Sequence, residues 1–383
     1  MKIILATPMY PPEMDGVAAY SKELAERLRN AHDITIVAYA STSENIAGVK
    51  LLTVSKRRPL GVRLPKFFWT LMRASRGADV IYVQNAVAAG LPAVIVGTLL
   101  HIPVVLKFVG DESWERAAQL RQTTKHLEEF LASNDGSFKI RTLRRVQRFT
   151  LRHASMVTTP SAYLADTLAH FYGVPRERLV VNYNAAEKPE VTPFEKAAVP
   201  HQLAATARLV EWKGIDGIIR AVALLVKKFP DIKLFIAGDG PEEAQLKALA
   251  KELQVANHVT FLGRVSRAET WHVRKTSEVY VLNSTYEGLP HTALTSFAAG
   301  IPIIATNIPG TDEAVYDEKS GLLVPAGDDT ALARAIERLF EDAPLRAQLI
   351  AGGKKILEEK FSWSAHIATL LSLCESVRFK PRH

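Results

Sequence analysis

Residues 284–304, STYEGLPHTALTSFAAGIPII, hold the order of signals that decides the fold: an acid, a turn, a helix and a strand. Glu287 stands before the turn Gly288-Leu289-Pro290, a helix-compatible run follows as far as Gly300, and a β-branched strand comes next. This order points the free N–H groups of a helix N-terminus at the mouth of a parallel sheet, where they attract phosphate. An ordinary αβ unit with a solvated Glu287 would have the same residues, so this stretch alone leaves both interpretations open.

Three further turns in the same half of the chain follow short apolar runs, at Ala207–Gly214, Gly238–Glu242 and Gly263–Val265. In the first of them, Arg208 and Lys213 are close enough to converge on one diphosphate, the Arg as a fork and the Lys as a point charge. Each turn taken separately is also compatible with a plain βα connection. All four turns in this order, within roughly 100 residues, favour a phosphate-binding sheet edge.

With these motifs the chain resembles the retaining glycosyltransferases of family 4, which have the GT-B fold. The resemblance is strongest from Ala205 to Ala326, and in the first half it rests on residues 11–18 and on Gly110–Glu112. It implies an α/β protein with two doubly wound, parallel-sheet, Rossmann-like domains that face a deep cleft, and a C-terminal helix that crosses back to the first domain. It also implies that a nucleotide-sugar donor binds the second domain and an acceptor the first.

The resemblance assigns roles to single residues. Arg208 and Lys213 match the family's diphosphate contacts, and Glu287 matches the acid that contacts the donor sugar. Asp111 matches the acid of a Gly-Asp pair near the reacting sugar, which makes these four the expected catalytic set. Gly16 matches the glycine loop that approaches donor and acceptor, where the missing Cβ lets backbone come close to a ligand. Further donor contacts are expected at Gly238, Val265, Gly288, Leu289 and Pro290.

Two positions depart from the family pattern. The family's second Glu, eight residues after the first, is Thr295 here, and a Thr hydroxyl is a weaker partner for the nucleotide ribose than a carboxylate. The family's His before the Gly-Asp pair is Val109. His291 is close enough in sequence to contact the donor sugar, but it could equally be a partly exposed loop residue.

The implied chemistry is a front-face transfer in which the departing phosphate takes the acceptor proton. Arg208, Lys213 and the helix amides would stabilise the charge of the leaving diphosphate. The resemblance implies no metal, and the sequence has no ligand cluster with metal-binding spacing. We therefore expect no cofactor other than the donor substrate.

Length and composition agree with a two-domain globular protein. The chain has 383 residues, of which 48% are hydrophobic and 23% charged. We expect a first domain at 1–187 with 362–383 packed on it, a Pro-rich linker at 188–200, and a second domain at 201–361.

The apolar stretch Ala86–Leu106 is interrupted by Pro92 and Pro103, so it predicts a buried helix and a strand rather than a membrane span. A single cysteine, Cys374, fits a reducing, cytoplasmic compartment.

The positive charge is concentrated in the first half. Residues 1–187 contain 24 Lys and Arg against 16 Asp and Glu, a net of +8, whereas residues 188–383 contain 24 of each. The excess lies mainly in Lys56–Arg73, where it alternates with aromatic residues, and in Lys139–Arg152, where five arginines share one helical face. This pattern is typical of a helix at an anionic membrane surface, and equally of a core helix with a solvated basic face. No nucleic-acid motif accompanies the charge.

These observations predict a retaining glycosyltransferase of hexosyltransferase type that acts on a lipid-linked or other glycan acceptor. It would work in the cytoplasm, with a peripheral position on the inner leaflet if the basic face meets lipid. Two alternatives stay open at this point: a nucleotide-sugar epimerase of the same fold, and a catalytically weak relative that binds glycan or nucleotide.

Overall fold

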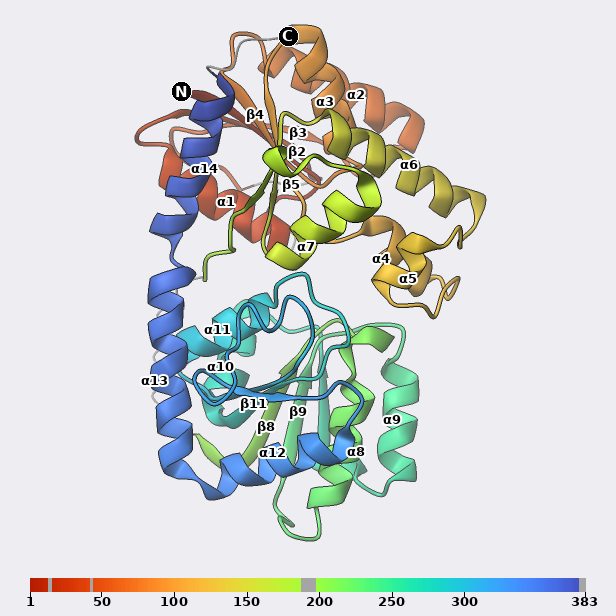
Figure 1. The fold of residues 1–383 in the computed structure, drawn as a ribbon, viewed down its shortest axis with the longest axis vertical. Coiled ribbons are helices and arrows are strands. Elements are labelled where there is room, and N and C mark those ends of the chain that lie inside the picture. Colours follow the sequence, from red (N-terminus) through yellow and green to blue (C-terminus); the bar gives the residue numbers. More distant parts are fainter. Residues whose placement is uncertain (13–15, 42–43, 187–197, 379–383) are drawn as a thin grey trace. The chain divides into compact units, whose positions relative to one another are not determined.

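The computed structural model describes residues 1–12, 16–41, 44–186 and 198–378 (Figure 1). It divides into two compact units: unit 1 is Met1–Asn182 with Ile367–His383, and unit 2 is Tyr183–His366. Each unit contains a parallel sheet with helices on both faces. The predicted fold class, with two doubly wound parallel sheets, is therefore confirmed.

The sheet of unit 1 has the strand order β3-β2-β1-β4-β5-β6-β7, with parallel pairing between neighbours. Its strands are apolar and rich in β-branched residues because both faces are covered, and all residues of the central strand β4 are buried. Their bounds are β1 (Lys2–Thr7), β2 (Asp33–Tyr39), β3 (Lys50–Val54), β4 (Val80–Gln84), β5 (Val104–Lys107), β6 (Met156–Thr159) and β7 (Leu179–Val181).

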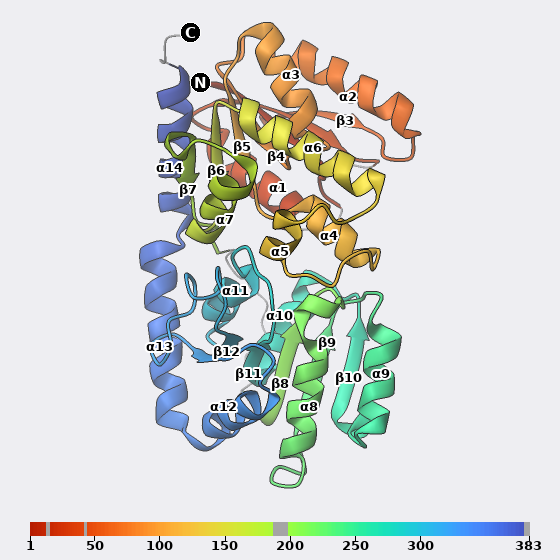
Figure 2. The ribbon, with the colours of Figure 1, turned by 45° about the vertical axis from the view of Figure 1, so that its right-hand side comes forward.

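Helices α2, α3 and α6 lie side by side on one face of this sheet (Figure 2). The apolar stretch 86–106 forms helix α3 and strand β5, as predicted, and no helix in the described part of the chain is long and apolar enough to span a bilayer. The helices between the strands are α1 (Gly16–Leu28), α2 (Leu60–Ala74), α3 (Gly90–Leu100), α4 (Glu112–Gln119), α5 (Leu127–Ala132), α6 (Phe138–His153) and α7 (Ala162–Thr167).

The last helix, α14 (Trp363–Arg378), carries the chain from unit 2 back to unit 1. Its residues Leu370 and Cys374 line a small apolar cavity with Leu24 of α1. Farther along, Arg378 Nε lies 3.0 Å from Asp79 Oδ1. Unit 1 is thus completed by residues from the other end of the chain.

The sheet of unit 2 has the order β10-β9-β8-β11-β12-β13. The predicted linker 188–200 falls mostly outside the described residues, and β8 begins at Val199, within the last two residues of that range. Pro200 is tolerated there since the pairing of β8 with β11 shifts register at this point. The bounds are β8 (Val199–Thr206), β9 (Lys233–Ala237), β10 (Val259–Gly263), β11 (Ser277–Leu282), β12 (Ile303–Thr306) and β13 (Leu322–Val324).

Alternate side chains of these strands pack into two separate hydrophobic cores. Leu203 and Val279 pack with helices α8 (Ile215–Leu225), α9 (Glu243–Glu252) and α12 (Asp329–Glu341). On the opposite face, Ala204 and Tyr280 pack with α10 (Arg267–Thr276), α11 (His291–Ala299) and α13 (Ala343–Lys360). The strand period of two assigns neighbouring residues to opposite faces and so fixes which helices cover which side.

Strands β8 and β11 are neighbours at the centre of the sheet, and the strand order runs in opposite directions on either side of them. Ligands of open parallel sheets bind beyond the carboxyl ends of the strands at such a switch point. The turns that follow β8 and β11 contain Arg208, Lys213 and Glu287. The fold thus brings two distant predicted motifs to one place.

Gly214 permits the close approach of these two turns. Its φ is +59°, and a Cβ at this position would lie 2.0 Å from the carbonyl oxygen of Asn283, the residue after β11. A side chain would therefore meet both a left-handed backbone and a steric overlap with another backbone segment.

We predict that Gly214→Ala lowers the free energy of unfolding of unit 2 by about 2–4 kcal/mol, the sum of a backbone cost and an overpacking cost. Gly300→Ala is the matched control, because Gly300 has a φ of +68° but its Cβ would meet only Ile350, at 4.0 Å. The control should lose about 1 kcal/mol. Urea denaturation of both variants tests this, and equal losses would mean that the contact with Asn283 relaxes at no cost.

Candidate functional site

Lys213 and Glu287 meet at the carboxyl edge of the sheet in unit 2. Lys213 Nζ lies 2.5 Å from Glu287 Oε1, and the two side chains are only 21% and 11% exposed. Ser284 Oγ donates a second hydrogen bond, of 2.7 Å, to the same oxygen. In the part of the chain that the structure describes, no residue donates a hydrogen bond to Glu287 Oε2. One carboxylate oxygen is thus held by the protein while the other can accept from a ligand hydroxyl.

Backbone contacts between the two turns hold this pair in place. The Thr285 N–H donates to the Trp212 carbonyl at 2.9 Å, and Asn283 Nδ2 donates to the Gly214 carbonyl at 2.9 Å. On the other side, a Cβ on Gly310 would lie 2.5 Å from the carbonyl oxygen of Glu287. The turn at Glu287 is therefore enclosed by two other backbone segments, and the sequence reasoning did not identify Gly310.

Arg208 lies on the same turn as Lys213, after β8, and is exposed. Its turn packs against the turn at Gly238, where a Cβ would lie 1.9 Å from the Ala207 carbonyl oxygen, and the Leu209 N–H donates to the Asp239 carbonyl. Among the described residues, no acid pairs with the Arg208 side chain. An exposed cation without an acidic partner is suited to a phosphate ligand, because binding breaks no existing ion pair.

The remaining predicted donor contacts start from the same edge. Val265 follows β10, and Gly288, Leu289 and Pro290 lead into helix α11, whose N-cap is Pro290. Leu289 is buried in the core beneath this turn, so only its backbone can serve a ligand. His291 is the first residue of α11 and is partly exposed. The structure thus gathers all predicted unit 2 residues at one end of one sheet.

Thr295 is 5% exposed, and its hydroxyl is engaged within its own helix. Thr295 Oγ1 donates to the carbonyl oxygens of His291 and Thr292, at 3.2 and 3.0 Å. A hydroxyl has a single proton to donate. Thr295 can therefore offer a ribose only an acceptor, as a carboxylate would, but this acceptor is uncharged and belongs to a residue that is only 5% exposed.

A buried cation that the sequence reasoning missed lies beneath the Arg208 turn. Arg274 of α10 is 5% exposed, and its Nη2 donates to Oγ1 of Thr206, the last residue of β8, at 2.5 Å. Its guanidinium also lies 5.1 Å from the ring centroid of Tyr280. Among the described residues no carboxylate pairs with it, and its Nε has no partner. Because arginine keeps its proton when buried, it adds a fixed positive charge to this edge.

In unit 1, Gly16 begins α1, and a Cβ there would meet nothing within 4 Å. Crowding by the protein therefore does not explain this glycine, and the preceding residues 13–15 lie outside the described part of the chain. Gly16 stays a predicted ligand contact.

Asp111 has a structural role. Its side chain is fully buried and caps α4, with Oδ1 accepting from the Trp114 N–H at 2.9 Å and from Ser113 Oγ at 2.6 Å. Its Oδ2 accepts from Gln147 Nε2 at 2.8 Å and from the Tyr172 hydroxyl. Both oxygens are thus occupied by protein donors, and no face is open to a substrate. We therefore leave Asp111 out of the catalytic set in which the sequence placed it.

The next residue, Glu112, is the unusual acid of this edge. The pKa of Glu112 is raised to about 7. Burial is the main cause, and the nearby charges of Glu115 and Asp111 add to it. The hydrogen bond that Asn85 donates to Glu112 lowers the pKa by less than these effects raise it. The carboxyl therefore changes charge near neutral pH, at the carboxyl end of the unit 1 sheet.

The raised pKa of Glu112 predicts a pH-dependent stability. In the folded state the Glu112 carboxyl keeps its proton up to about pH 7, whereas in the unfolded state, with the ordinary pKa of 4.5, it loses the proton at lower pH. The free energy of unfolding of the wild type therefore falls as the pH rises from 4.5 to about 7. Glu112→Gln removes this titration. Its free energy of unfolding relative to wild type should therefore increase from pH 5 to pH 8, by up to ~3 kcal/mol.

Urea denaturation at several pH values measures this difference. Glu129→Gln, at an exposed site on α5, is the control and should differ from wild type by a constant amount. A Glu112→Gln difference that does not change with pH would show that the carboxyl titrates normally.

Comparison with known proteins places this site in a family. Residues 193–356 match the model of glycosyl transferases group 1, and residues 15–185 match the glycosyl transferase 4-like domain. LpsE, a lipopolysaccharide core biosynthesis glycosyltransferase of Rhizobium meliloti, is 30% identical over 65% of this chain and 73% of its own. An uncharacterized glycosyltransferase of Methanocaldococcus jannaschii is 26% identical over 95% of both chains.

Among solved structures, HepE of Anabaena in complex with UDP and glucose is similar with a TM-score of 0.78, at 18% identity, over 98% of this chain and 100% of HepE. This likeness shows the same fold. The chain belongs to the group 1 glycosyltransferases, has the GT-B fold that its sequence predicted, and is an enzyme of the hexosyltransferase type.

Proposed function

We propose that this enzyme transfers a hexose from a nucleotide-sugar to a glycan acceptor with retention of the anomeric configuration. The observation that carries the proposal is the contact of 2.5 Å between Lys213 and Glu287, which come from the two turns at the switch point of the unit 2 sheet. A cation for a leaving phosphate and an acid for a sugar hydroxyl are thus neighbours. The names of two similar proteins agree with this: LpsE acts in lipopolysaccharide core biosynthesis, and HepE was solved with UDP and glucose.

In this proposal the bond between the anomeric carbon and the diphosphate oxygen breaks, and the acceptor oxygen attacks from the same face. The departing phosphate oxygen takes the acceptor's proton, so no protein base is needed. Arg208, Lys213 and the N-terminus of α11 stabilise the charge that develops on the diphosphate, while Glu287 holds a sugar hydroxyl. The mechanism requires no metal, so EDTA should leave turnover unchanged.

We further propose a lipid-linked acceptor, handled by unit 1 at the cytoplasmic face of a membrane. The net charge of +8 in residues 1–187 supports an anionic partner on that unit. Because Thr295 is only 5% exposed and its hydroxyl is uncharged, we infer that the nucleotide ribose is held mainly by other groups.

A screen with UDP-, GDP- and ADP-sugars tests the class of reaction. A transferase releases nucleoside diphosphate faster when acceptor is present. An epimerase would change the sugar without an acceptor, and a binding relative would release nothing although calorimetry detects the nucleotide.

We predict that Arg208→Ala reduces turnover about 100-fold, because a cation that stabilises the leaving group acts mainly in the transition state. The fold should be unaffected, since the side chain is exposed and makes no ion pair with any described residue. Lys213→Ala should reduce turnover similarly but also lower stability, because it leaves the Glu287 carboxylate without its partner. Lys227→Ala, at an exposed site beyond the far end of α8, is the control. Turnover in Arg208→Ala within threefold of wild type would contradict the assignment.

We predict that Glu287→Gln weakens binding of the nucleotide-sugar by about 10- to 100-fold, since it removes a charged hydrogen bond to a sugar hydroxyl, which contributes roughly 1.5–3 kcal/mol. Binding of the bare nucleoside diphosphate should change little. Calorimetry with both ligands separates the two effects. An equal loss for both would mean that Glu287 acts through Lys213 or through the fold.

A further inference from the structure

Helices α5 and α6 of unit 1 border a pocket of about 390 Å³ that is lined by arginines. Arg141, Arg144, Arg145 and Arg148 of α6 form one wall, and residues 131–134 at the end of α5 form the other. No carboxylate is among its lining residues in the described part of the chain. The volume is in the range of small-ligand sites.

The protein holds these arginines in position through backbone oxygens. Arg144 Nη1 donates to the Ser133 carbonyl at 2.7 Å and its Nη2 to the Phe130 carbonyl at 3.0 Å, with the guanidinium 4.3 Å from the Phe130 ring centroid. Arg148 Nη2 donates to the Phe171 carbonyl at 3.0 Å, and Arg141 Nη1 to the Gly136 carbonyl at 3.3 Å. These bonds orient the charges but do not neutralise them.

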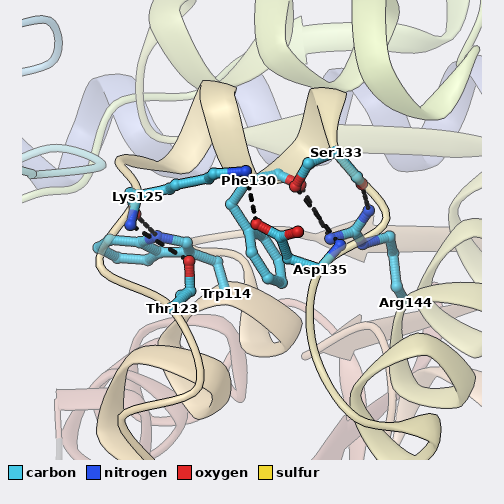
Figure 3. Close-up of polar contacts among 7 residues, drawn as sticks. All are labelled: Trp114, Thr123, Lys125, Phe130, Ser133, Asp135 and Arg144. Carbon is cyan, nitrogen blue, oxygen red and sulfur yellow. Dashed lines mark hydrogen bonds and ion pairs between the residues drawn. The ribbon is translucent and has the colours of Figure 1, made fainter.

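The acid nearest in sequence to this wall is engaged elsewhere. Asp135 pairs with Lys125 at 2.7 Å, and its carboxylate lies between Lys125 and the Arg144 guanidinium that contacts Ser133 (Figure 3). The hydrogen bond from Lys125 is the main reason that the pKa of Asp135 is lowered, and the charge of Arg144 contributes least. Among the described residues, none of the four arginines forms an ion pair, and the buried Nε of Arg144 has no partner.

Four like charges around one pocket repel each other, and a chain gains nothing in stability by holding them there. An anion in the pocket would offset the repulsion between the arginines. Each guanidinium group can donate paired hydrogen bonds to the oxygens of a phosphate. We propose that the pocket binds a phosphate group carried by the acceptor. The assignment to the acceptor rests on the proposed function, whereas phosphate binding itself does not.

Two observations favour a discrete phosphate group over a membrane surface at this site. The arginines line a concave pocket, and Arg141, Arg144 and Arg148 each donate a hydrogen bond to a backbone carbonyl that orients the guanidinium. A flat bilayer is contacted by protruding side chains, whereas a single phosphate can enter a pocket. The pocket also belongs to the segment α4–α6 that leaves from the carboxyl end of β5, the edge at which ligands of a parallel sheet bind.

The test measures binding of inorganic phosphate by calorimetry in the Arg208→Ala background, which removes a cation of the donor edge. Arg141→Gln with Arg145→Gln should weaken phosphate binding at least tenfold, and the loss should shrink as salt increases. Arg145 is exposed and Arg141 has only one long hydrogen bond, so the double variant should fold normally. Arg152→Gln, on the same helix but outside the pocket, is the matched control and should bind phosphate as the background does.

Vesicles of anionic and of neutral lipid distinguish the source of the phosphate. If the pocket serves an acceptor, the double variant should lose binding of phosphate and of soluble glycerol phosphate but keep any binding to anionic vesicles. Loss of vesicle binding together with unchanged phosphate binding would overturn the proposal in favour of a membrane contact.

Absence of phosphate binding in the Arg208→Ala background would also overturn it, as would equal binding by the double variant and the control. A wild type that turns over a nucleotide-sugar but binds no phosphate here would refute only this inference. A wild type that binds phosphate here but turns over no nucleotide-sugar would refute only the proposed transfer.

Discussion

The arrangement of charges at the carboxyl edge of the unit 2 sheet depends on how closely the turns after β8 and β11 can approach each other. Gly214 has no side chain, so its turn lies against the Asn283 carbonyl oxygen, where a Cβ would be only 2.0 Å away. This approach places Lys213 beside Glu287, and hydrogen bonds from Asn283 and Thr285 maintain it. A local feature of one backbone residue thus sets the distance between two charges that are 74 residues apart in the sequence.

The two charged sites are built on different electrostatic principles. At the carboxyl edge of the unit 2 sheet, Lys213 already forms an ion pair with Glu287, so a ligand there would share the Lys213 charge with this carboxylate. In the arginine pocket of unit 1, the charges are oriented by backbone carbonyls, and none of the four arginines forms an ion pair with a described residue. A site whose charges are already paired costs the protein little stability when it is empty, and it favours a ligand that can replace the ion pair. A site whose charges are unpaired attracts any anion of suitable size.

Much of the fold could be predicted from the sequence because its signals are local. The buried strands are short apolar runs, and Pro92 and Pro103 correctly indicated a helix and a strand rather than a membrane span. The turns with Arg208 and Glu287 were found because parallel strands always bring their carboxyl ends to one edge. The N-cap role of Asp111 was not predicted, although an acid before Glu112 and Glu115 is typical of an N-cap, because the family motif favoured a catalytic role.

Other parts of the site depend on contacts that no local pattern contains. Arg274 looks like an ordinary helix residue until its partner Thr206, 68 residues away, is known. The basic face of α6 predicted a surface helix, and only the end of α5 turns that face into a pocket. Periodicity identifies which residues share a face, but the shape of the surface opposite comes from tertiary structure.

Helix α14 has a consequence for how the protein is made. Unit 2 is one continuous segment, Tyr183–His366, so all of its residues have been synthesised before the chain is complete. Most of unit 1 precedes unit 2 in the sequence, yet Leu370, Cys374 and Arg378 belong to the packing of unit 1 and follow all of unit 2. On the ribosome, unit 1 therefore cannot finish folding before unit 2 has been synthesised, and its apolar surface around Leu24 stays uncovered until then.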